Sequence, residues 1–116
     1  MIMFEIIFYQ TPRNDYPVKD FIKNLDTKSR AKIYRSLEQL EKEGPNLLRP
    51  YADVVRGKIR ELRVDFSSTS VRIFYFFFLK NNIVLLHAFK KKVQRLPEKE
   101  ILRAEKYMAN WIERTG

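Results

Sequence analysis

Cysteine is absent from the 116-residue sequence. Disulfide bonds, thiolate metal sites and cysteine nucleophiles are therefore excluded, and a reducing, cytoplasmic location is permitted and expected. Histidine occurs once, at position 87, and no group of carboxylates has the spacing of a metal site. We therefore expect no metal and no other cofactor.

Long hydrophobic runs are also missing. The most apolar run, residues 71–79, has about half the length that a membrane span needs and contains Arg72. Residues 1–10 are apolar over only a short stretch and include Glu5, which favours a strand over a signal peptide. Internal repeats and linkers are absent too, so we expect residues 1–116 to form one domain without a membrane segment.

Positive charge is in excess. The sequence has 23 Lys and Arg against 14 Asp and Glu, a net charge of +9, and residues 58–95 hold nine basic side chains against Glu61 and Asp65. Such a charge attracts polyanions, nucleic acids among them. A solvated basic surface is the alternative interpretation. Because the excess falls on predicted strands rather than on helices and loops, we favour a nucleic-acid partner.

The first half of the chain predicts a strand followed by two helices. Residues 2–9 are rich in β-branched and aromatic side chains, as strands are. Helices are predicted to begin at Pro17 and near Thr27, because apolar residues then recur at helical spacing, and Gly44 ends the second helix. Segment 46–57 is the least regular, and we interpret it as a connection with at most a short helical turn.

The second half predicts three strands and a last helix. The strands cover residues 58–66, 71–79 and 83–89, and the short polar turns between them make them antiparallel neighbours. After Pro97, apolar residues at helical spacing predict a helix. The element order is therefore β-α-α-β-β-β-α, an α+β fold with helices packed on an antiparallel sheet.

Two-residue alternation assigns side chains to the two faces of these strands. Arg63 and Glu61 fall on the face away from the apolar Leu62. Arg72 falls opposite Val71, so it need not be buried with the core. We expect the two arginines and Glu61 to cluster on an open sheet face. Third-strand residues with the parity to join them are His87, Phe89 and Lys91.

At this point the sequence resembles a known family. The segments that carry the resemblance are IRELR at 59–63, RIFYFF at 72–77, LLHAF at 85–89, and a tail with Lys91, Lys92, Gln94, Pro97, Glu100, Ile101 and Ala104. In this order they resemble the phage-derived HigB-like branch of the RelE toxin superfamily. Two departures are Val93, where the family usually has threonine, and Leu96, which replaces a small polar residue.

The resemblance implies a RelE-like microbial ribonuclease fold and a toxin that cuts messenger RNA in the ribosomal A site. It also implies three partners: the ribosome, mRNA and a helix-turn-helix antitoxin of the HigA kind, which silences the toxin and represses its operon.

Cutting RNA through its own 2′-hydroxyl needs a base, cationic donors for the phosphoryl oxygens and an acid for the leaving 5′-oxygen, but no metal. Arg63 and Arg72 suit phosphate, because guanidinium offers planar paired donors and stays charged. Lys91 and Lys92 are candidates for the proton donor. The alternative roles are ion pairing with Glu61 and Asp65 for the arginines, and a solvated turn for the lysines.

Glu61 is expected either to act as the base or to orient the arginines. His87 is expected either to take part in acid–base chemistry or, more often for a lone histidine among apolar residues, to be a hydrogen-bonded residue at the edge of the core. Residues assigned to RNA backbone contacts are Arg60, Lys90, Gln94 and Arg95.

Two groups of apolar residues have alternative readings. Phe74, Phe76 and Phe78 could stack on bases, but we favour core. The apolar stripe of the last helix is expected to serve as core or antitoxin contact, and it consists of Ile101, Met108 and Trp111.

Two competing functions remain. The RelE superfamily also contains toxins that poison DNA gyrase on the same scaffold, and fold does not fix function. The second competing function is that of a non-enzymatic nucleic-acid-binding regulator. We favour the metal-independent endoribonuclease because of the basic sheet with Arg72 and the lysine pair.

Overall fold

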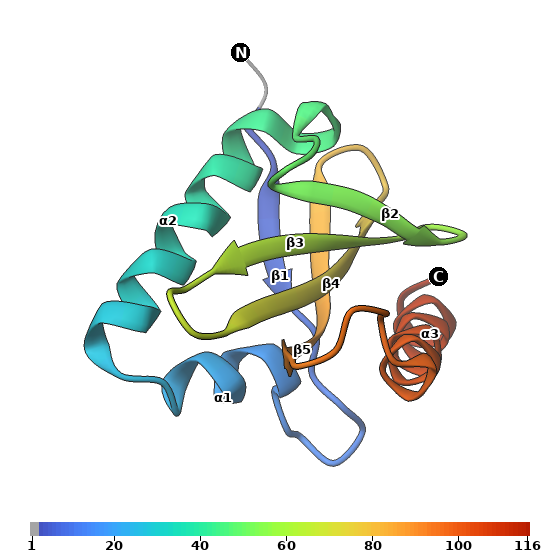
Figure 1. Ribbon diagram of the computed structural model, residues 1–116. Coiled ribbons are helices and arrows are strands. Elements are labelled where there is room, and N and C mark those ends of the chain that lie inside the picture. Colours follow the sequence, from blue (N-terminus) through green and yellow to red (C-terminus); the bar gives the residue numbers. More distant parts are fainter. Residues whose placement is uncertain (1–2) are drawn as a thin grey trace.

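The computed structural model describes residues 3–116, and Ile2, the predicted start of the first strand, lies outside them. The strands are β1 (Glu5–Phe8), β2 (Ala52–Arg56), β3 (Ile59–Asp65), β4 (Ser70–Phe78) and β5 (Asn82–Lys91) (Figure 1). The helices are α1 (Pro17–Lys23), α2 (Thr27–Glu43) and α3 (Glu98–Thr115), with a 3-10 turn, η1, at Gly44–Asn46. The predicted α+β fold class is confirmed.

Local sequence sets the ends of the long helix α2. The Asp26 carboxylate accepts a hydrogen bond of 2.7 Å from the backbone N–H of Ser29, which caps the start of the helix. Gly44 ends it with a positive φ of 53°, and any side chain there would collide with the Phe4 ring. No helix within residues 3–116 is long and apolar enough to cross a membrane.

The sheet has one strand more than the sequence predicts. Its order is β1-β5-β4-β3-β2, and β2 lies in the segment interpreted as a connection. The pattern of β2 is weak because it is a short edge strand, buried at Ala52 but exposed at Val54. Gly57, with φ of 57°, begins the tight turn into β3. This turn was the available signal for a hairpin.

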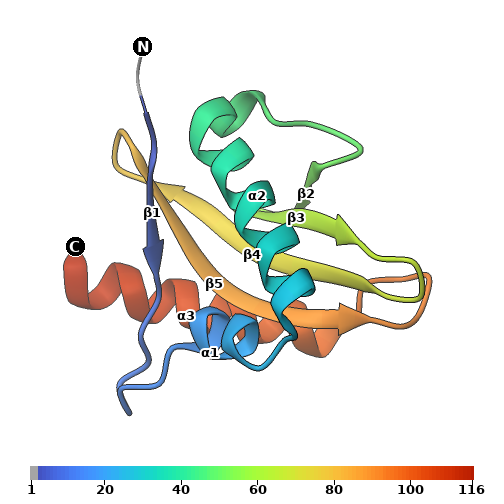
Figure 2. The same ribbon diagram turned by 90° about the vertical axis from the view of Figure 1, so that its left-hand side faces the viewer.

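The sheet is also mixed rather than wholly antiparallel. β1 pairs with β5 in parallel, with Ile6 opposite Ile83, whereas every other pairing is antiparallel (Figure 2). Short turns predict antiparallel neighbours. No turn joins β1 to β5, so the direction of this pair depends on the path of the chain through α1 and α2.

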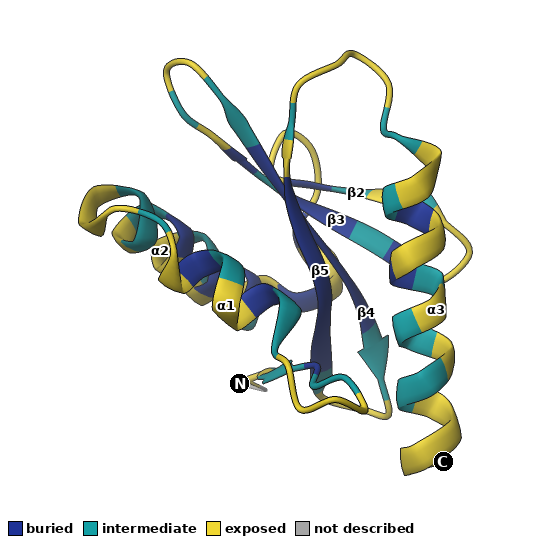
Figure 3. Ribbon diagram, turned by 90° about the horizontal axis from the view of Figure 1, so that it is seen from below, coloured by how far each residue is buried: buried dark blue, intermediate teal, exposed yellow. Residues whose placement is uncertain are grey.

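Helices cover both faces of the sheet. α1 and α2 lie on one face and α3 on the other (Figure 3). The larger core lies under α1 and α2 and includes Leu62, Ile73 and Leu85. The smaller core lies under α3 and includes Phe74 and Phe89. The face that carries Glu61 and Arg72 is therefore partly covered, and the expectation of an open face there is wrong: these residues are only 3% and 9% exposed.

The aromatic residues of β4 belong to the α3 core. Phe74 and Phe76 are fully buried, and Phe78 packs against the same cluster with its ring 5.7 Å from that of Trp111. The preference for core over base stacking is therefore confirmed. The helix stripe Ile101, Met108 and Trp111 packs there too, which confirms its core role.

Candidate functional site

The ends of β3, β4 and β5 bring the predicted site residues together. Arg63 lies directly opposite Arg72, and Arg72 lies opposite Phe89. Two residues further along each strand, Ser70 lies opposite Lys91. Directly opposed residues share a sheet face. The two arginines and Lys91 therefore share the face on which α3 packs.

Glu61 lies between the two arginines. Its Oε2 accepts a hydrogen bond of 3.1 Å from Nε of Arg63, and its Oε1 lies 3.0 Å from Nε of Arg72. The second contact has ion-pair distance but not the alignment of a hydrogen bond. The Glu61 side chain is only 4% exposed. A buried carboxylate with both oxygens engaged orients the guanidinium groups rather than approaching a ribose hydroxyl.

Two further carboxylates flank this cluster. Asp53 of β2 lies 3.4 Å from Nη2 of Arg63. Asp65 lies 3.6 Å from Nη1 of Arg72, which also donates a hydrogen bond to the Ser70 hydroxyl. The structural ion pairs of the alternative interpretation are therefore present.

Each guanidinium keeps a donor for a ligand. Within residues 3–116, no side-chain hydrogen bond uses Nη1 of Arg63 or Nη2 of Arg72. The Arg63 side chain is 27% exposed and that of Arg72 11%. Arg63 is consequently the more accessible of the two.

His87 is engaged with α3. Its Nε2 lies 2.8 Å from Oε1 of Glu100, and its ring stacks on Phe89. Burial lowers the pKa of His87, an effect that the Glu100 carboxylate opposes but does not outweigh. His87 shares this face with Phe89 by two-residue alternation, and a bulge at Leu86 shifts the alternation of the earlier part of β5, because Phe74 pairs with His87 and Tyr75 pairs with Leu85. The geometry favours the core-edge role over acid–base chemistry.

The basic residues of the β5 end divide between the two faces. Lys91 is half-buried on the arginine face, and Lys92, Gln94 and Arg95 are exposed in the segment that leads to α3. Lys90 lies opposite Val71 and therefore points to the other face. Arg60 also belongs to that other face, opposite Tyr75, and it is half-buried with an unpartnered Nε. The structure does not bring Arg60 or Lys90 to the arginines.

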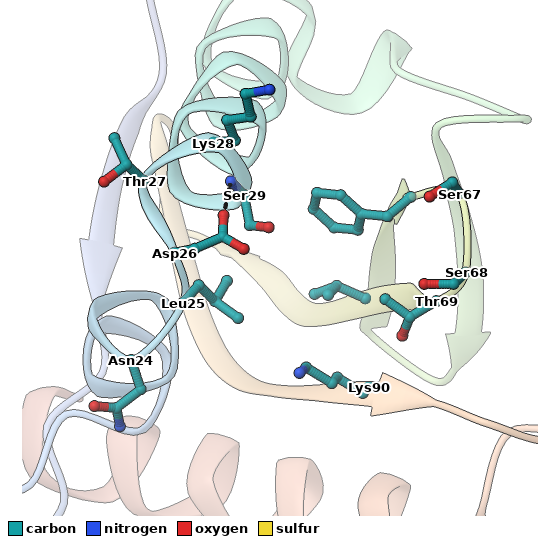
Figure 4. Close-up of a pocket in the computed structure, with 12 residues that line it drawn as sticks. Asn24, Leu25, Asp26, Thr27, Lys28, Ser29, Ser67, Ser68, Thr69 and Lys90 are labelled. Carbon is teal, nitrogen blue, oxygen red and sulfur yellow. Dashed lines mark hydrogen bonds between the residues drawn. The ribbon is translucent and has the colours of Figure 1, made fainter.

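A groove of about 850 Å³ lies on this second face, and it is not lined by the arginines (Figure 4). The α1–α2 junction forms one wall, and residues 67–69 of the β3–β4 turn form the other. The groove therefore lies around the end of the sheet from the arginine cluster, which has its own, mostly buried, position on the α3 face.

Sequence reasoning missed three partners of the site. Asp53 was missed because β2 was not recognised. Ser70 was placed in a connection, although it opens β4. Glu100 was named only in the tail that carries the family resemblance, and nothing in its spacing links it to His87 thirteen residues earlier.

The arrangement suits anion binding better than proton transfer. Glu61 and His87 are both engaged, so the proton-carrying candidates that remain are Lys91, which is half-buried, and Lys92, which is exposed. No cluster of three or more His, Cys, Asp or Glu residues that could hold a metal ion occurs within residues 3–116. The site therefore offers preorganised cationic donors beside two lysines.

One family model matches most of the chain. The model of the family described as phage derived protein Gp49-like (DUF891) matches residues 20–109. No curated protein matches the chain. The matched segment contains both arginines, Glu61, His87 and the lysines, and it is most of the chain. The chain therefore belongs to the Gp49-like family of phage-derived proteins, a family of the RelE/HigB toxin superfamily.

Proposed function

We propose that this chain is the toxin of a toxin–antitoxin pair of the HigB kind and that it cuts messenger RNA in the ribosomal A site. The observation that carries the proposal is the arginine pair. Glu61 holds Arg63 and Arg72 side by side, and Lys91 lies on the same face, two residues beyond the partner of Arg72 on β5. Family membership and the charge of +9 support it. The ribosome, mRNA and a helix-turn-helix antitoxin are the proposed partners, and the cytoplasm is the proposed location.

In this proposal the arginines bind the scissile phosphate. The RNA 2′-oxygen attacks phosphorus, the bond to the 5′-oxygen breaks, and the products are a 2′,3′-cyclic phosphate and a 5′-hydroxyl. The free Nη donors stabilise the charge on the phosphoryl oxygens. Lys91 or Lys92 gives a proton to the leaving oxygen. Glu61 keeps the guanidinium groups in register and is a positioning residue.

The proton of the 2′-hydroxyl has no obvious acceptor on this face. Glu61 is buried between arginines, and Nε2 of His87 is hydrogen-bonded to the Glu100 carboxylate. We therefore propose that solvent water accepts this proton as the 2′-oxygen attacks. The ribosome, which holds the message in the A site, aligns the 2′-oxygen, and we expect slow cutting without it.

A second candidate follows from the same engagement of Glu61 and His87. A surface that offers hydrogen-bond donors to phosphate but no free general base is also what a non-enzymatic nucleic-acid-binding toxin or regulator would have. The gyrase-poisoning relatives belong to this class of binding toxins.

Induced expression in bacterial cells separates these candidates. Primer extension on cellular messages is the readout for cutting, and plasmid supercoiling is the readout for gyrase. We expect growth arrest with cuts inside codons and normal supercoiling. Growth arrest with intact messages would overturn the nuclease proposal, and relaxed plasmids would assign the chain to the gyrase class. Co-expression of a neighbouring helix-turn-helix protein is expected to restore growth.

A further inference from the structure

We propose that the groove between the α1–α2 junction and the β3–β4 turn binds the single-stranded RNA that continues from the arginine site. The inference rests on the proposed function and extends it to a second site on the opposite face of the sheet. It concerns a cavity that the arginine chemistry does not use.

The groove and the arginine site meet where β4 starts and β5 ends. Lys91 lies opposite Ser70 on the arginine face, while the adjacent pair, Lys90 and Val71, faces the groove. Successive residues of a strand point to opposite faces. Only the strand ends and the β3–β4 turn therefore separate the two sites, and a nucleic-acid strand that passes over this end contacts both.

The lining of the groove suits a nucleotide. Figure 4 shows Asp26 and Ser29 at the start of α2 facing the turn Ser67, Ser68 and Thr69, with Lys90 between the two walls. The lining hydroxyls can bond ribose and phosphate oxygens. A volume of about 850 Å³ is ample for a drug-sized ligand, a nucleotide among them.

Basic residues continue the groove along α2. A neighbouring cavity of about 410 Å³ shares Lys28, Ser29 and Phe66 with the groove and adds Lys32 and Arg35. The Lys32 ammonium lies over the Phe66 ring, 4.9 Å from its centre. A positively charged track beside an aromatic ring is the usual arrangement for sequence-independent binding of single strands.

Asp26 is the one acidic residue among those that line the two cavities, all of which lie in the described part of the chain. Its hydrogen bonds with Ser29 lower the pKa of its carboxyl group, which is therefore ionised at neutral pH. This charge opposes phosphate at the start of α2. We therefore expect the RNA backbone to lie along the lysines and the turn.

The test is fluorescence anisotropy with oligouridylates of about four and about twelve nucleotides, the range of single-strand site sizes. Lys28→Glu with Lys90→Glu is expected to weaken binding of the long oligonucleotide about tenfold and to have little effect on the short one. The slope of log affinity against log salt should fall by about 1.4, the value for two phosphates on a single strand.

The matched control is Lys99→Glu with Arg103→Glu, two exposed residues of α3 with the same change in charge. We expect the control to affect both oligonucleotides weakly and equally. Equal losses of affinity for the long oligonucleotide in the groove variant and in the control would overturn the proposal that the groove binds RNA.

Asp26→Asn keeps a capping side chain and removes the negative charge. We expect it to tighten binding of the long oligonucleotide, and unchanged or weaker binding would contradict the proposed path.

Two outcomes separate this inference from the proposed function. If Arg63→Ala leaves both oligonucleotides bound while the groove variant no longer binds the long one, the assignment of the arginines to RNA binding is wrong and the assignment of the groove holds. If the groove variant binds RNA normally but no longer binds a polyglutamate peptide that the wild type binds, the groove belongs to an acidic protein segment and the inference is wrong.

Discussion

The carboxylate of Glu61 and the guanidinium of Arg72 form an ion pair of 3.0 Å across neighbouring strands, and both side chains are almost fully buried. Removing one partner of such a pair leaves a charge that water cannot reach. The pair therefore links the proposed chemistry to the stability of the fold, and variants of it must be tested for both.

Arg72→Ala is expected to abolish toxicity and to lower the free energy of unfolding by about 3 kcal/mol, the low end for a broken buried ion pair, because Glu61 retains Arg63. Arg63→Ala, with a more exposed side chain, should cost about 1 kcal/mol or less. Chemical denaturation and a plasmid toxicity test measure the two effects. An Arg72→Ala protein that unfolds like wild type and remains toxic would refute the proposed role.

Glu61→Gln distinguishes a positioning residue from a general base. The amide keeps the shape of the side chain but no longer attracts both guanidinium groups, so we expect cleavage to slow by about tenfold to a hundredfold. If Glu61 only positions the arginines, the pH dependence of the remaining activity keeps its shape. Loss of the acidic limb of the pH–rate profile in this variant would identify Glu61 as the base.

The stability of the protein should fall as pH drops below about 6.5. Burial lowers the pKa of His87 in the folded state, so the unfolded chain binds a proton first. The stability contributed by the neutral ring is present above the unfolded pKa and is lost as pH falls toward the lowered folded pKa. His87→Gln removes this dependence while carboxylates elsewhere titrate as before. The free energy of unfolding of both proteins is measured by denaturation between pH 8 and pH 5. If it falls equally with pH in the wild type and in His87→Gln, this role of His87 is ruled out.

Leu62→Ala tests the other face of β3. Leu62 is 1% exposed in the core under α1 and α2, so its truncation should cost about 2–5 kcal/mol through the cavity that it leaves. Activity per folded molecule should be retained, because Leu62 points away from the arginines. A variant that is fully stable but inactive would show that the two faces have been assigned wrongly.

Much of the fold could be predicted because its signals are local. The alternation that places Leu62 and Arg63 on opposite faces predicted that Arg63 and Arg72 share a face, and in the structure they lie directly opposite each other. The direction of β1 and the presence of β2 could not be predicted with the same certainty, because one depends on the path through two helices and the other on a short edge strand.

The burial of the site was not predictable from strand parity. Parity states which face a residue occupies, but not what covers that face. Arg72 was expected on an open surface, whereas α3 packs on this face and the Arg72 residue is 9% exposed. The contact of Glu100 with His87 was not predicted either. The pairing of Glu61 with both arginines could be inferred as an alternative. Choosing between positioning and base catalysis required its burial and its two contacts.

Dependence on the ribosome tests the central claim most directly. The measurement compares the rate at which the purified protein cuts one message, free in solution and held in the A site of programmed ribosomes. We predict cuts inside the A-site codon on the ribosome and little cutting of the free message. With Arg63→Ala we predict no cutting of the message in either state. Efficient cutting of the free message, or an intact message on ribosomes that bind the protein, would contradict the account.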